Sequence, residues 1–83
     1  MAKAFVPNFE FDTLGEDLVL TFQVLFFGGG LRDLSIVSVT ILGTDTLAQV
    51  KQKLVNAISV EATNLGYSVS ATDIILPVFQ KGG

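Results

Sequence analysis

LVLTFQVLFFGGGLRDLSIVSVTIL, residues 18–42, is the stretch that decides the fold of this 83-residue chain. Apolar and polar residues alternate on both sides of three consecutive glycines, a pattern that predicts two strands joined by a turn. Pairing Val24 with Val37 gathers apolar side chains on one face, and the same register places Gln23 opposite Ser38 on the other. Because polar residues then meet polar residues, we expect an antiparallel hairpin in this register.

The second face of this hairpin also carries large apolar residues beside the glycines. The register pairs Leu25 with Ile36 and Phe27 with Leu34, and it leaves a connection from Gly28 to Asp33. Burial of four such side chains contributes about 6 to 12 kcal/mol before association costs are subtracted. Either the N-terminal segment folds over this cluster, or the cluster is an interface with another molecule. It is our main interface candidate.

The N-terminal segment has an aromatic alternation of its own. Phe5, Pro7, Phe9 and Phe11 share one parity, which predicts a strand with an aromatic face. Pro7 lacks an N–H group, so we expect this strand at a sheet edge. Alternatively, residues 1–17 form an arm that reaches a neighbouring subunit. The predicted interface therefore also includes the three phenylalanines.

After residue 43 the apolar period changes to that of an amphipathic helix. Its stripe consists of Leu47, Val50, Leu54, Ala57, Ile58, Ala62 and Leu65. Thr46 and Gln49 form a predicted capping box, and Gly66 is placed to end the helix. Val55 and Val60 lie off the stripe, where they are either scattered surface residues or a second contact line.

The order of elements predicts a single small domain over residues 1–83. A last extended segment covers residues 73–79, and residues 80–83 are expected to form a mobile tail. Three strands, one helix and one strand (β-β-β-α-β) suit an α+β fold with two layers. The helix then packs on one face of an antiparallel sheet.

Composition narrows the function classes. The chain is 49% hydrophobic and only 16% charged, with a mean hydropathy of +0.60, so we expect part of its exterior to be apolar. A net charge of −3 argues against nucleic-acid binding. Zero His and zero Cys argue against zinc sites and thiol chemistry. We expect no cofactor and no enzymatic activity.

Neither a membrane span nor an export signal is predicted. The longest apolar run, residues 18–27, is interrupted by Thr21 and Gln23 and is much shorter than the roughly 20 residues that a membrane helix needs. The N-terminus reaches Pro7 and Asn8 before an apolar core can form, so it does not resemble a signal peptide. We expect a cytoplasmic or virion location.

The acidic residues Glu10, Asp12, Glu16 and Asp17 form the cluster that could bind a cation. Their spacing lacks the Asp or Asn that a calcium loop needs at the position of Leu14, so a solvated acidic turn is the alternative. A glycosidase carboxylate pair would need a pocket, and none is indicated. We predict no metal site.

One segment resembles the ubiquitin-like β-grasp family. After the hairpin comes DTLAQVKQKL at residues 45–54, then a strand, and the chain ends in Gly82 and Gly83. In that family an Asp-Thr pair opens the helix and the terminal glycines are joined to targets. The resemblance implies a modifier or adaptor with Gly83 as its conjugation site.

The chain is also similar in character to the small accessory proteins of tailed-phage virions. These cement, decoration and capsid-associated subunits are often free of His and Cys, poor in charge and rich in strands, as this chain is. The similarity is an analogy of composition. It implies a non-enzymatic subunit that forms homo-oligomers and binds a larger protein shell.

Overall fold

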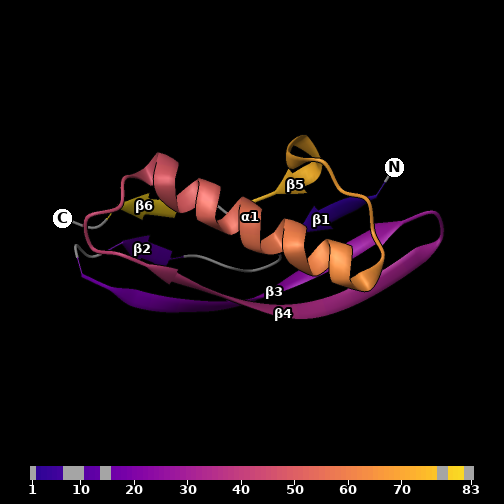
Figure 1. Cartoon of the computed structure of the whole chain (residues 1–83), viewed down its shortest axis with the longest axis horizontal. Helices are drawn as coiled ribbons and strands as arrows, with labels where there is room; N and C mark the ends of the chain where they lie inside the picture. The colour runs from indigo at the N-terminus through magenta and orange to yellow at the C-terminus, as the bar shows by residue number, and fades with distance from the viewer. Residues whose placement is uncertain (1, 7–10, 14–15, 77–78, 82–83) are drawn as a thin grey trace.

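A computed structural model describes residues 2–6, 11–13, 16–76 and 79–81 (Figure 1). The elements in chain order are β1 (Lys3–Phe5), β2 (Phe11–Thr13), β3 (Leu18–Gly28), β4 (Leu31–Ile41), α1 (Leu47–Leu65), a short 3₁₀ helix (Ala71–Asp73), β5 (Ile74–Ile75) and β6 (Phe79–Lys81). The hairpin of β3 and β4 runs along the whole molecule, and α1 lies over it. The predicted hairpin and helix are therefore both present.

The hairpin register differs from the predicted one by two residues along β4. Val24 pairs with Ser35, where Val37 was predicted, and Leu25 pairs with Leu34. A shift of two residues preserves which side chains share a face, so the inner and outer faces are the predicted ones. The predicted individual pairs are wrong.

The reason for the shift is the turn. Only Gly29 and Gly30 connect the strands, with φ angles of 57° and 83°. Two successive positive φ angles are the geometry of a type I′ turn, whose twist matches that of the flanking strands. Pairing therefore begins at Gly28 and Leu31, and the longer connection from Gly28 to Asp33 is wrong.

β1 lies inside the main sheet, whose order is β4-β3-β1-β5. It runs antiparallel to β3 and parallel to β5, so the sheet is mixed, although an antiparallel sheet was predicted. Ala4 pairs with both Phe26 and Ile74. The prediction of an edge strand is therefore wrong for Lys3–Phe5, because this strand ends before Pro7 and every residue in it has an N–H group.

The start of α1 is capped as predicted. The Thr46 hydroxyl accepts a hydrogen bond from the Gln49 backbone N–H at 3.2 Å, and the Gln49 side chain accepts from the Thr46 N–H at 2.8 Å. At the other end Gly66 has a φ of 88°, and its N–H bonds the Ala62 and Thr63 carbonyls. These contacts satisfy backbone groups that a helix end would otherwise leave without partners.

The core lies between α1 and the inner face of the main sheet. Its buried side chains are Ala4, Val6, Leu20, Phe22, Val24, Phe26, Val37, Val39, Ile41, Val50, Leu54, Ile58, Ala62 and Ile74. Val55 packs against this core, so it is not a surface residue. Leu47 and Leu65, at the two ends of the predicted stripe, are exposed instead. The protein is thus a small two-layer α+β domain.

Tyr67 connects the segment after α1 to the hairpin. Its ring stacks on Phe26 with 5.8 Å between centroids, and its hydroxyl donates to the Asp33 carboxylate at 2.8 Å. Desolvation raises the pKa of the Tyr67 phenol, and the hydrogen bond and negative charge of Asp33 act in the same direction. This contact fixes the tip end of the hairpin against the helix layer.

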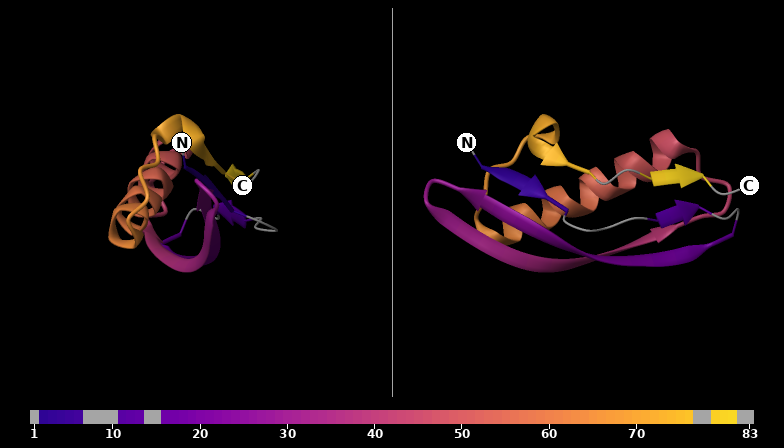
Figure 2. Two further views of the ribbon diagram at one scale, coloured as in Figure 1. Left: turned by 90° about the vertical axis from the view of Figure 1, so that its right-hand side faces the viewer. Right: turned by 180° about the vertical axis from the view of Figure 1, so that it is seen from behind.

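A second, two-stranded sheet pairs β2 with β6 in parallel. Gln80 and Lys81, assigned above to a mobile tail, pair with Asp12 and Thr13, whereas residues 82 and 83 lie outside the described residues. The molecule is elongated, with extents of 42 × 20 × 19 Å. Figure 2 shows that the main sheet curls around α1, so its outer face is convex.

Candidate functional site

A continuous apolar row crosses the outer face of the main sheet. Leu34 of β4 pairs with Leu25 of β3, Leu25 pairs with Phe5 of β1, and Phe5 pairs with Ile75 of β5. Directly paired residues point to the same face of a sheet, so these four side chains lie next to one another. We call Leu34, Leu25, Phe5 and Ile75 the apolar row.

The apolar row is open to solvent. Leu34 is 59% exposed, Ile75 46% and Phe5 39%, while Leu25 at its centre is half-buried. Ile36, on the same face of β4, is 65% exposed. The alternative that the N-terminal segment covers these residues is wrong for β1, because β1 lies beside β3 in the sheet and extends the row.

Phe27 occupies a second row beside the first. Its cross-strand neighbours are Lys3 on β1 and Arg32 on β4, and both cations are exposed. We call Lys3, Phe27 and Arg32 the basic row. Lys3 and Arg32 are the only formally charged residues among the described residues of β1, β3, β4 and β5 that point to the outer face. The face thus combines apolar and cationic groups, although the chain as a whole carries a charge of −3.

Close approach of the N-terminal backbone to the hairpin builds both rows. A Cβ placed on Gly28 would lie 2.6 Å from the Cα of Ala2, so only glycine lets the chain begin its strand there. Ala4 then enters the core with no exposed surface, and Phe5 points outward. The short alternation in KAF thus places one aromatic residue in the row.

The predicted interface residues divide into two groups. Phe5, Leu25, Phe27, Leu34 and Ile36 share the outer face of the main sheet, which brings the two predicted clusters together. Phe9 lies outside the described residues. Phe11 lies in β2, where its backbone pairs with Phe79, and its side chain is outside what the structure describes.

Sequence reasoning missed Ile75, Lys3 and Arg32. Ile75 joins the row only because β5 pairs in parallel with β1, and this contact spans nearly the whole chain. Sequence alternation shows which residues share a face of one strand, but it does not show which strands are neighbours. The available sequence signal was the pair of adjacent isoleucines, Ile74 and Ile75. In a strand, neighbouring side chains point to opposite faces, and in the structure Ile74 is buried while Ile75 is exposed.

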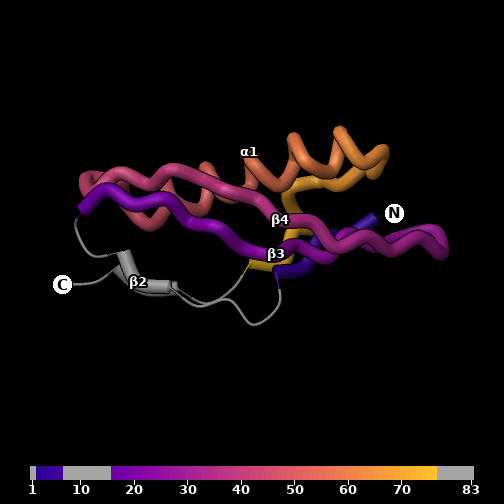
Figure 3. The backbone as a smooth tube through the Cα atoms, turned by 90° about the horizontal axis from the view of Figure 1, so that it is seen from below, coloured from indigo at the N-terminus to yellow at the C-terminus, as the bar shows by residue number. Residues whose placement is uncertain are grey.

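A groove is lined by residues of β4 and α1. Figure 3 shows the helix running along β4. The groove has a volume of about 340 Å³ and is lined by Ile36, Val37, Ser38, Ala57, Val60 and Glu61. Val60 is 62% exposed in it. The Glu61 carboxylate accepts a hydrogen bond from the Ser35 hydroxyl. We call this the edge groove; it combines apolar walls with one carboxylate.

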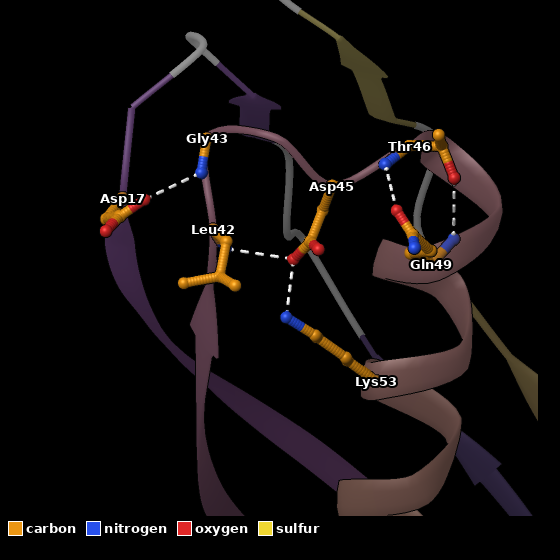
Figure 4. A network of polar contacts seen from close by, with 7 residues as sticks. All are labelled: Asp17, Leu42, Gly43, Asp45, Thr46, Gln49 and Lys53. Carbon is orange, nitrogen blue, oxygen red and sulfur yellow. Dashed lines mark hydrogen bonds and ion pairs between the residues drawn. The ribbon is translucent and has the colours of Figure 1, made fainter.

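One described residue of the acidic turn, Asp17, makes a structural contact. The Asp17 carboxylate accepts a hydrogen bond from the Gly43 N–H at 2.8 Å, which ties the start of β3 to the end of β4 (Figure 4). Glu10 lies outside the described residues. No group of three or more His, Cys, Asp or Glu side chains among the described residues is arranged to hold a metal ion.

Asp45 is the one buried charged residue of the described chain. Its carboxylate accepts from the Leu42 N–H at 2.9 Å and from the Lys53 ammonium at 2.5 Å (Figure 4). A buried carboxylate needs such partners to offset its desolvation. The cluster holds the β4–α1 connection against the first turns of the helix.

No helix within the described residues is long and apolar enough to cross a membrane. Comparisons with family models, with curated proteins and with solved structures found no match to this chain.

Proposed function

We propose that this chain is a non-enzymatic structural subunit that assembles with itself and with a larger protein shell, through the outer face of its main sheet. A capsid-associated or decoration component of a virion is the role that fits its composition. The apolar row is the observation that carries this proposal. Four neighbouring apolar side chains on four strands form a continuous patch, in which Leu34, Ile75 and Phe5 are exposed, and such patches mark interaction sites.

Comparison of the free energy gained by burial of the apolar row with the cost of association shows how large the contact between subunits must be. Full burial of one large apolar side chain contributes about 1.5 to 3 kcal/mol, so the partly exposed residues of the row and Ile36 contribute about 3 to 6 kcal/mol together. Association costs at least about 4 kcal/mol in lost translational and rotational freedom. The apolar row therefore anchors a contact, and a stable assembly needs additional surface.

The test uses one substitution at the centre of the row and one matched control. Phe5→Asp places a charge between Leu25 and Ile75 and is expected to dissociate the assembly, because burial of an unpaired carboxylate is unfavourable. Val19→Asp adds the same charge to the same face at a residue that is 65% exposed and pairs with Thr40, away from the row. Light scattering during size-exclusion chromatography measures the molar mass of each.

We expect Val19→Asp to assemble as the wild type does. Circular dichroism must show unchanged helix content in both variants, since Phe5 lies at the surface of a folded sheet. Equal masses for wild type, Phe5→Asp and Val19→Asp would exclude the apolar row as the interface.

A further inference from the structure

The partner surface of the outer face can be argued from its shape. The outer face is convex because the sheet curls around α1, and two convex faces touch only over a small area (Figure 2). A concave partner surface buries more of the apolar and basic rows. The edge groove is a shallow hollow on the same chain, lined by both apolar and polar residues, and its exposed residues Ile36 and Val60 are not part of the buried core.

Charge complementarity points to the same pair of surfaces. The basic row presents two exposed cations on either side of Phe27. The edge groove presents the Glu61 carboxylate beside Ala57 and Val60. A carboxylate has more acceptor positions than the single Ser35 hydroxyl fills, so Glu61 retains capacity for a cation. Complementary potentials of this kind fix which surfaces meet and in which orientation.

We infer that the basic row of one copy docks into the edge groove of a second copy, with Phe27 against the apolar wall and Lys3 or Arg32 beside Glu61. The inference rests on the proposed function and names the partner surface in it. Phe27 is the apolar residue of the basic row, and it is half-buried. Its aromatic ring can pack on the apolar residues of the groove while a neighbouring cation approaches the Glu61 carboxylate.

The geometry of such a contact has a consequence for the assembly. The basic row and the edge groove are different surfaces, so the contact is heterologous: each copy offers its groove to one neighbour and its basic row to another. Heterologous contacts generate rings when the rotation closes and filaments when it does not. A repeating contact of this kind lets one small subunit cover an extended shell.

Charge exchange between the two surfaces tests the inference. Arg32→Glu places an acid opposite Glu61 of the neighbouring copy, and Glu61→Lys places a cation opposite Arg32. Each variant alone is expected to self-associate about ten-fold more weakly or worse, because like charges then meet at every contact. An equimolar mixture of the two variants restores opposite charges at every mixed contact, and so does the double variant R32E/E61K. Sedimentation velocity measures the assembly size.

Lys51→Glu is the control because it makes the same charge change as Arg32→Glu at an exposed residue of α1 outside both surfaces. It should assemble as the wild type does. Failure of the mixture and of the double variant to regain assembly overturns the inference, and so does unchanged assembly of either single variant. In both cases the proposed function stands if Phe5→Asp still dissociates the wild-type assembly. A wild type that never assembles overturns both.

Discussion

At the residue scale, Gly29 and Gly30 set the positions of the candidate interface side chains on the hairpin. Their positive φ angles allow a two-residue turn, and that turn fixes the register of every pair in the hairpin. Leu25 therefore lies directly opposite Leu34, and Phe27 opposite Arg32. With the longer predicted loop, Leu25 would have faced Ile36 and Phe27 would have faced Leu34, so Arg32 would not lie beside Phe27.

Substitution of the turn glycines should separate backbone strain from steric effects. A Cβ added at either residue meets nothing within 4 Å, so only the positive φ matters. Gly30→Ala is expected to lower the free energy of unfolding by about 1 to 2 kcal/mol. Gly29→Asn should leave it nearly unchanged, because Asn-Gly is the favoured type I′ pair. Urea unfolding midpoints compare the two, and equal losses would contradict the assigned turn.

At the element scale, α1 begins where local sequence and tertiary contacts agree. The Thr46–Gln49 capping box is a purely local signal and was predicted from the sequence. The contact of buried Asp45 with Lys53 and the Leu42 N–H reinforces the same boundary from inside the fold. The helix is thereby held along β4, where it forms one wall of the edge groove.

Removal of the cap should weaken this boundary by a known amount. Thr46→Ala is expected to lower the free energy of unfolding by about 1 kcal/mol, since the Gln49 N–H loses its acceptor. Thr46→Ser keeps an acceptor and should behave like the wild type. Chemical denaturation together with amide exchange of the first helical turn measures the effect. Identical stability of the Ala and Ser variants would show that the capping box contributes nothing.

The elements also show how far the sequence predicts this fold. Hairpin faces, helix ends and the α+β class follow from local alternation and caps, so they were predicted. The position of β1 between β3 and β5 and the separate pairing of β2 with β6 depend on contacts between the two ends of the chain, which periodicity does not encode. For the same reason Leu25, Phe27, Leu34 and Ile36 were found as a cluster, while Ile75 and Lys3 were not. Arg32 was missed because the predicted connection from Gly28 to Asp33 included it.

At the scale of the whole molecule, the large exposed apolar surface is the property on which our proposal of a partner rests. Among the residues whose burial the structure describes, the large exposed hydrophobic ones are Phe5, Val19, Leu31, Leu34, Ile36, Leu42, Leu47, Val60, Leu65 and Ile75. Single exposed apolar residues are common on protein surfaces. In the apolar row, however, the exposed residues Phe5 and Ile75 are direct neighbours on the paired strands β1 and β5. Among the described residues, α1 covers only the inner face of the main sheet, and we propose that another molecule covers the outer face.

The measurement that tests this account most directly is sedimentation equilibrium of the wild-type chain across the micromolar range. Burial of the apolar row between subunits predicts an average mass that rises with concentration to a multiple of the 8.9 kDa chain. The Phe5→Asp variant should remain monomeric over the same range. A wild type that stays at 8.9 kDa at every concentration would contradict the claim that this face assembles the protein.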